Sequence, residues 1–170
     1  FLQPEPIKVN TPSSVSEVKV PENSVLNILV GSDGKIFLGT DNKNDMVSML
    51  QTVTDKFGVK INGKQLKNYK EESMVGVPVS IIADYLNLEP EKMAEEIQKH
   101  GIPTDSIDGG MSEFQEWVKA AREANPDIKI AIKCDSKTSY KVVKTMMSEL
   151  QDMNENRYQL ITNLKTSSED

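Results

Sequence analysis

The sequence predicts an α+β fold in which a small mixed β-sheet has helices packed on one face, with a C-terminal βαβ unit and a helical insertion in the middle. Apolar side chains recur at every second residue in 26–30, and apolar residues alternate with mostly polar ones in 128–134, which indicates strands. Between and after these segments, apolar residues recur at helical spacing. The order of strands, helices and strands along the chain therefore favours one compact α+β domain.

The first pair of strands is predicted by the segment "VLNILVGSDGKIFL". Leu26, Ile28 and Val30 fall on one face of an extended segment, and a second apolar run follows the turn. Asp33-Gly34 supplies the positive φ that a tight turn needs. Residues 25–38 are thus predicted to form a β-hairpin.

The middle of the chain is predicted to be helical, with one loop. Residues 44–57 carry a helical stripe that stops at Gly58, and a polar, Lys-rich loop is expected after Lys60. Two short helices are expected between Pro78 and Gly101. Ser112 and Gln115 have the spacing of a capping box at the start of a further helix, which ends at Asn125-Pro126.

The C-terminal part is predicted to form a strand, a helix and a strand. Residues 128–134 alternate between apolar and mostly polar side chains, so one face of this strand should be buried and the other largely wet. A Val/Met stripe in residues 142–153 indicates a helix, and Tyr158 to Leu164 a final strand. This order predicts a βαβ crossover between parallel strands.

Composition excludes several classes of function. The 170 residues carry a net charge of −6, which offers no electrostatic footprint for nucleic acid or an anionic membrane. The single cysteine, Cys134, excludes an intramolecular disulfide. No run of about 18 apolar residues occurs, and the first residue is Phe1, so the chain is expected to be a soluble piece of a longer protein.

Three regions are expected along the chain. Residues 1–23 hold four of the eight prolines without any periodic apolar pattern and are predicted to be a flexible arm. Residues 24–165 are predicted to form the α/β domain, within which 60–110 are an expected insertion, and residues 166–170 a disordered tail.

The residues that could be catalytic or bind a metal are better explained by structural roles. Asp135 ends a strand beside a helix start, where capping is more common than catalysis. His100 is expected in a last helical turn and has no second His or Cys partner for a zinc site, and Cys134 continues a buried face. Residues 41–45, "DNKND", lack the glycine and the final acid of a calcium loop and are expected to cap a helix. No cofactor, metal or enzymatic activity is predicted.

The segment "NPDIKIAIKCDSKTSYKVVKTMMSEL" with the later "RYQLIT" resembles the C-terminal half of the ExbD/TolR family of biopolymer transport proteins. Asp135, Tyr140, Val142, Val143 and Met146 fall on the pattern of that family. The hairpin resembles its strand, Asp-Gly-Lys, strand element, and the proline-rich start resembles the arm that leaves the membrane.

The resemblance implies the periplasmic domain of a single-pass inner-membrane protein in a complex energised by the proton-motive force. It implies a homodimer, a motor subunit of the ExbB/TolQ type and a transducer of the TonB/TolA type as partners. Contacts are expected along the edge of the last strand, at Tyr158, Leu160 and Thr162, and in the arm, at Val9 and Pro12.

Two other functions remain open from the sequence. A domain that binds peptidoglycan or another cell-envelope ligand would need a polar cleft with convergent Asp and Arg, and only Arg122 and Arg157 are available as arginines. An enzyme would need a pocket that holds Asp135, Lys137 and Tyr140 with perturbed pKa values.

Overall fold

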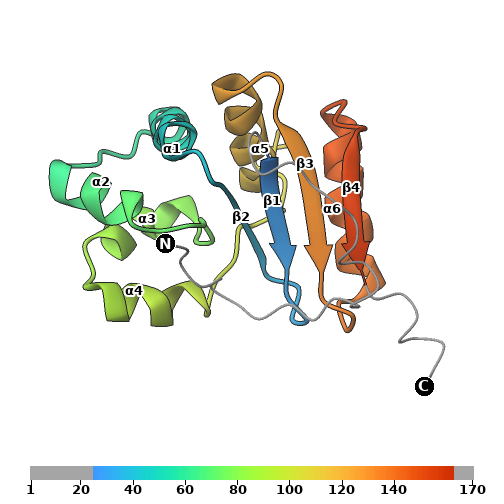
Figure 1. The fold of residues 1–170 in the computed structure, drawn as a ribbon, viewed down its shortest axis with the longest axis horizontal. Helices are drawn as coiled ribbons and strands as arrows, with labels where there is room; N and C mark the ends of the chain where they lie inside the picture. The colour runs from blue at the N-terminus through green and yellow to red at the C-terminus, as the bar shows by residue number, and fades with distance from the viewer. Residues whose placement is uncertain (1–24, 163–170) are drawn as a thin grey trace.

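A four-stranded mixed sheet organises the computed structural model, which describes residues 25–162 (Figure 1). The strand order is β2-β1-β3-β4. β1 pairs antiparallel with β2 and parallel with β3, and β3 pairs parallel with β4. The α+β fold and its mixed sheet are therefore confirmed.

The predicted hairpin is formed by β1 (Val25–Val30) and β2 (Ile36–Thr40). The backbone amide of Gly31 donates to the carbonyl of Lys35 at 3.0 Å, and Gly34 has a φ of +86°. A glycine is suited to this φ because it has no Cβ to clash. The turn therefore forms where Asp33-Gly34 predicts it.

The C-terminal βαβ unit is also confirmed. β3 (Lys129–Cys134) leads through α6 (Tyr140–Asp152) to β4 (Tyr158–Thr162), which lies parallel beside it. Met146 and Leu150 are the buried residues of α6, while Val142, Val143, Met147 and Met153 are partly buried against the core. The Val/Met stripe thus packs on the sheet as its spacing predicts.

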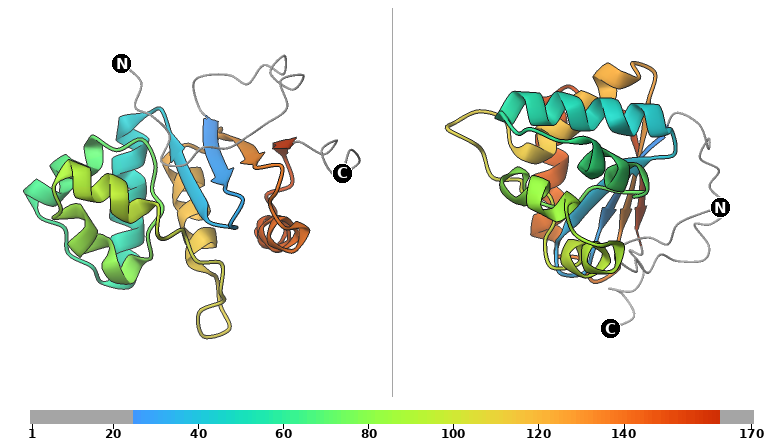
Figure 2. Two further views of the ribbon diagram at one scale, coloured as in Figure 1. Left: turned by 90° about the horizontal axis from the view of Figure 1, so that it is seen from below. Right: turned by 90° about the vertical axis from the view of Figure 1, so that its left-hand side faces the viewer.

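Helices cover one face of the sheet, as Figure 2 shows for α5 and α6. α5 (Glu113–Ala124) begins at the capping box of Ser112 and Gln115 and supplies Trp117, the largest fully buried side chain. α1 (Lys43–Phe57) packs against α5, starts at the side-chain cap of Asn42 and stops at Gly58 in the left-handed conformation. Residues 41–45 thus cap a helix, as predicted.

The prediction of a Lys-rich loop after Lys60 is wrong, because most of this segment forms a helix, α2 (Gly63–Lys70). Asn62 and Gln65 make a capping box, and the hydroxyl of Tyr69 donates to the carbonyl oxygen of Met46 at 2.6 Å. The helix has a narrow buried face, Gln65 and Tyr69, so its sequence shows little apolar periodicity.

The two short helices expected next are confirmed as α3 (Val79–Leu86) and α4 (Pro90–Ile97), the latter with proline in its first turn. His100 lies beyond the end of α4, so its expected place in the last turn is wrong. A ring nitrogen of His100 lies 3.2 Å from Oε2 of Glu96, one turn back along the chain.

Residues 60–110 share the core of the sheet. Tyr69, Ile82, Leu86, Met93 and Ile97 belong to the same buried cluster as the strands. Val75 exchanges two backbone hydrogen bonds with Leu38, so the chain between α2 and α3 lies along the outer side of β2. Beyond that side lie α2, α3 and α4 (Figure 1).

The face of the sheet opposite α5 and α6 is less exposed to solvent than the sequence predicts. Ala131 of β3 is buried, and so are Leu29 and Phe37, which pair across β1 and β2 on the same face. The ring of Phe37 lies against Gly76, where a Cβ would collide with it. On this face of β3 Lys129 is exposed, Lys133 is half-buried and Ala131 is buried, so the expectation of a largely wet face is wrong for this strand.

Candidate functional site

The joint between β3 and α6 is a turn built by Asp135, and the expected capping role of Asp135 is wrong. The N-cap of α6 is Ser139, whose Oγ accepts from the amide of Lys141 at 3.1 Å. Asp135 lies four residues earlier, and its Oδ1 accepts from the amide of Lys137 at 2.9 Å. Its side chain therefore closes a local turn of the Asx type.

This turn also joins two neighbouring strands. The amide of Asp135 donates to the carbonyl of Val30 at 2.9 Å, and the hydroxyl of Thr138 donates to the carbonyl of Gly31 at 3.0 Å. Asp135 itself is 4% exposed. The carboxyl ends of β1 and β3 are therefore fastened together at this turn.

The geometry at the joint does not resemble a catalytic site. Tyr140 is 77% exposed whereas Asp135 is buried, so the two side chains do not face one another in a shared cavity. Burial raises the pKa of Cys134 to about 11, which keeps the thiol protonated and unreactive at neutral pH. Within residues 25–162 no group of three His, Cys, Asp or Glu side chains could hold a metal ion.

Asp135→Ala should lower the free energy of unfolding by roughly 1 kcal/mol, because the amide of Lys137 loses its acceptor. Urea unfolding followed by circular dichroism measures the change. Asp127→Ala, at an exposed position, is the matched control. An unchanged midpoint for Asp135→Ala together with lost function in cells would instead assign Asp135 to a partner contact.

The predicted contact residues of the last strand lie at an edge of the sheet. β4 is the outermost strand of the order β2-β1-β3-β4, and within residues 25–162 no strand pairs with its outer side. Tyr158 and Gln159 are half-buried, and Leu160 is 36% exposed. The strand ends at Thr162, while Val9 and Pro12 of the arm lie outside the described residues.

Arg122 positions the start of this edge, a role that the sequence did not reveal. Its guanidinium binds both carboxylate oxygens of Glu155, at 3.0 and 2.8 Å, and donates to the carbonyls of Pro126 and Ile128 at 2.8 and 2.7 Å. The hydrogen bond with Glu155 raises the pKa of Arg122 despite partial burial. Arg122 therefore ties the end of α5 and the start of β3 to the segment that enters β4.

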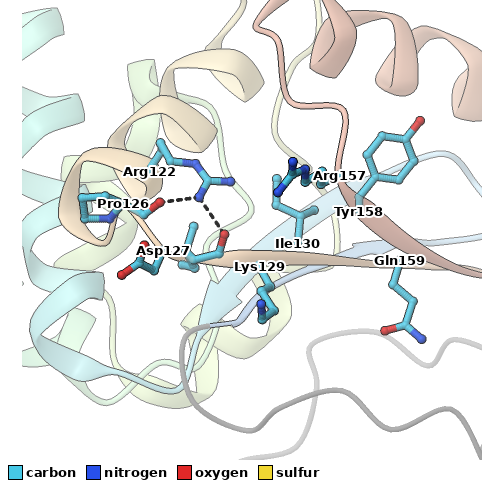
Figure 3. Close-up of a pocket in the computed structure, with 9 residues that line it drawn as sticks. Arg122, Pro126, Asp127, Lys129, Ile130, Arg157, Tyr158 and Gln159 are labelled. Carbon is cyan, nitrogen blue, oxygen red and sulfur yellow. Dashed lines mark hydrogen bonds between the residues drawn. The ribbon is translucent and has the colours of Figure 1, made fainter.

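A pocket of about 550 Å³ opens beside this clamp, at the amino ends of β3 and β4 (Figure 3). Its polar lining includes Arg122, Asp127, Lys129 and Arg157. In Figure 3, Arg157 lies between Arg122 and Tyr158, while Lys129 and Gln159 point to the other side of the strands. The structure thus brings the two arginines and one aspartate into a single pocket, although Arg122 is already engaged by Glu155.

A second group of polar contacts joins the start of α5 to α6. The hydroxyl of Ser112 donates to the carboxylate of Glu149, and the side-chain amide of Gln115 donates to the carbonyl of Glu149 at 3.0 Å. Burial raises the pKa of Glu149. The capping residues of α5 therefore also hold the helix that leads to β4.

Almost the whole chain matches one family of known proteins. The model of the family described as biopolymer transport protein ExbD/TolR matches residues 1–165. The chain belongs to the ExbD/TolR family. No curated protein and no solved structure matches the chain significantly.

Membership of the ExbD/TolR family makes the chain a component of an energy-transducing complex for biopolymer transport, and the family is not enzymatic. ExbD/TolR proteins are associated with the inner membrane, have a periplasmic domain, and act in general with partners of the ExbB/TolQ and TonB/TolA types. None of the helices in residues 25–162 is both long and apolar enough to cross a bilayer.

Proposed function

We propose that residues 24–165 are the periplasmic domain of a single-pass inner-membrane protein in a proton-motive-force-coupled transport complex, and that the domain acts by dimerisation and by binding partners. The observation that carries this proposal is the edge of β4, whose outer side pairs with no strand in the part of the chain that the structure describes. Unpaired amides and carbonyls along an edge strand can pair with a strand from another chain. The start of β4 is moreover held in place by the clamp of Arg122 and Glu155.

The partners follow from the family and from this edge. A second copy of the chain, a motor subunit of the ExbB/TolQ type and a transducer of the TonB/TolA type are the proposed partners, with Tyr158, Leu160 and Thr162 as contact residues. The proline-rich arm, with Val9 and Pro12, is proposed as a second contact element that docks in an extended conformation.

Leu160→Pro should abolish dimerisation, because proline removes a backbone donor and does not fit a paired strand. The unaltered chain should show a weak dimer that dissociates on dilution, because protein in dilute solution lacks the effective concentration that a shared membrane tether provides. Sedimentation equilibrium from micromolar to millimolar protein measures both.

Leu160→Pro could also detach β4 from β3, so a second variant is needed. Gln159→Lys keeps the backbone donor and adds a charge to the edge, which should weaken the dimer. Ser148→Lys, on the exposed side of α6, adds the same charge elsewhere and should leave the dimer unchanged. A strict monomer over the whole range, or a dimer insensitive to Gln159→Lys, would contradict assembly through this edge.

A further inference from the structure

The segment that contains α2 carries positive charge that the fold does not balance. Residues 56–70 include five lysines and no acidic residue, so the rest of the chain carries −11 against the +5 of this segment, for a net charge of −6. Nζ of Lys56 lies 3.9 Å from Oε2 of Glu116. Four lysines make no ion pair or side-chain hydrogen bond within residues 25–162: Lys60, Lys64, Lys67 and Lys70. The net charge therefore conceals a basic surface.

Three of these lysines share one face of α2. The buried residues of the helix are Gln65 and Tyr69, one turn apart. With 3.6 residues per turn, Lys67 points away from the buried side, and Lys64 and Lys70 flank it at about 60°. All three lysines are exposed. We call Lys64, Lys67 and Lys70 the lysine face of α2.

Helix stability does not account for the lysine face. Lys64 lies in the first turn of α2, where the helix dipole disfavours a positive charge. Like charges that are neighbours on a helix also repel one another. α4 shows the arrangement that stabilises a solvated helix, because Lys92 lies 4.0 Å from Glu95 and Lys99 lies 3.0 Å from Glu96. The unbalanced charge of α2 therefore indicates an anionic partner.

Apolar side chains border the lysine face. Three half-buried apolar residues line a pocket of about 360 Å³ together with Lys60: Val59, Ile61 and Leu66. Leu66 belongs to α2 itself, so this apolar border is continuous with the helix. Two exposed acids, Asp55 and Glu71, stand at the ends of the segment and offset only part of its charge.

The chemistry of this surface favours anionic lipid headgroups. Arginine is suited to bidentate contacts with carboxylates, whereas lysine binds phosphate groups as a point charge on a flexible stem. Lysines near a bilayer are attracted to anionic lipids without a fixed geometry, and apolar side chains beside them can enter the headgroup boundary. The ExbD/TolR family is associated with the inner membrane, so a bilayer is close to the domain.

The net charge of −6 does not prevent such a contact. At physiological ionic strength, charges farther than about 8 Å from one another are largely screened. A bilayer that touches α2 therefore interacts with the lysines more strongly than with the acidic remainder of the chain.

We propose that the lysine face of α2, with Lys60 and the apolar border, docks the domain on the anionic lipid headgroups of the membrane. α2 lies beyond β2, at the opposite end of the sheet from β4 (Figure 1). Docking through α2 thus leaves the edge of β4 accessible to protein partners. The docking rests on the membrane association of the family and does not require the dimer proposed above.

Co-sedimentation of the full chain with vesicles tests the docking. Vesicles of phosphatidylglycerol and phosphatidylcholine in equal parts should bind the chain, and vesicles of phosphatidylcholine alone should bind it weakly. The combined variant Lys64→Gln, Lys67→Gln and Lys70→Gln should bind on the order of a hundredfold more weakly, because each lysine near the surface contributes about fivefold. Three exposed lysines elsewhere give the matched control, which should change binding little: Lys119→Gln, Lys141→Gln and Lys144→Gln.

Equal binding of the two triple variants would overturn docking through α2, and equal binding to both kinds of vesicle would overturn a contact with anionic headgroups. Ile61→Ser tests the apolar border and should weaken binding several-fold without changing its dependence on salt. Circular dichroism checks that each variant is folded. Full binding by a folded Ile61→Ser chain would remove the apolar border from the contact.

Poly-glutamate, which offers carboxylates in place of phosphates, tests the class of partner. It should displace the chain from vesicles only weakly at the same concentration of negative charge. Displacement as strong as that by free phosphatidylglycerol vesicles, and lost in the lysine-face variant, would overturn the lipid surface and assign the face to an acidic protein. Sedimentation equilibrium separates the two proposals, because a chain that dimerises through β4 but ignores anionic vesicles contradicts the docking alone.

Discussion

Gly39→Ala should lower the free energy of unfolding by about 3 kcal/mol, the upper end of what overpacking costs. Gly39 lies in β2, and a Cβ at this position would collide with the backbone carbonyl of Ser73. That carbonyl belongs to the chain that pairs with β2 through Val75, so it can move only if this pairing is disturbed. Urea unfolding followed by circular dichroism gives the change in stability.

Gly63→Ala is the matched control for this substitution. Gly63 is the first residue of α2, and a Cβ built there meets nothing within 4 Å. Alanine should leave stability unchanged or raise it by up to about 1 kcal/mol, because it restricts the unfolded chain. Equal effects of the two substitutions would show that residues 73–75 do not lie tightly against β2.

Trp117→Ala should be the most destabilising single truncation, at about 4 kcal/mol, because it leaves a large cavity under the sheet. Trp117 is the largest fully buried side chain and the only tryptophan of the chain. Its removal also removes the tryptophan fluorescence signal, so circular dichroism during urea unfolding is the appropriate measurement. A loss below about 1 kcal/mol would mean that α5 does not pack as described.

Trp117→Phe tests the same site with less loss of volume. The indole Nε1 of Trp117 is buried and has no hydrogen-bond partner within residues 25–162. Phenylalanine therefore removes no hydrogen bond. The free energy of unfolding should fall by roughly 1–2 kcal/mol, because the substitution leaves only a small cavity. A loss as large as that of Trp117→Ala would indicate that the indole nitrogen has a partner after all, such as a buried water.

Local sequence signals were sufficient for the elements that depend on local interactions. The hairpin follows from alternation and Asp33-Gly34, and α5 follows from Ser112 and Gln115. α2 was missed although it has a capping box of its own, because three lysines dominate its eight residues and few of them are buried. A search for the Asn62 and Gln65 spacing could have found its start.

The candidate site depends on contacts between distant residues, and these were less predictable. Asp135 looked like a cap because it stands close to a helix start, but the backbone places four residues between Asp135 and α6. Arg122 and Glu155 are 33 residues apart, and no periodic pattern marks such a pair. The pocket beside them exists only because α5, β3 and β4 converge.

The neighbours at the centre of the sheet have a consequence for how the chain folds. β1 and β3 lie side by side, but residues 31–128 separate them in sequence. Pairing across so long a segment is slow, because the entropy of closing the loop is lost before the contacts form. The hairpin of β1 and β2 can therefore form early, while the side of β1 that faces β3 stays unpaired until β3 is made. During synthesis, that unpaired side is the surface that needs protection from aggregation until residue 134 has emerged.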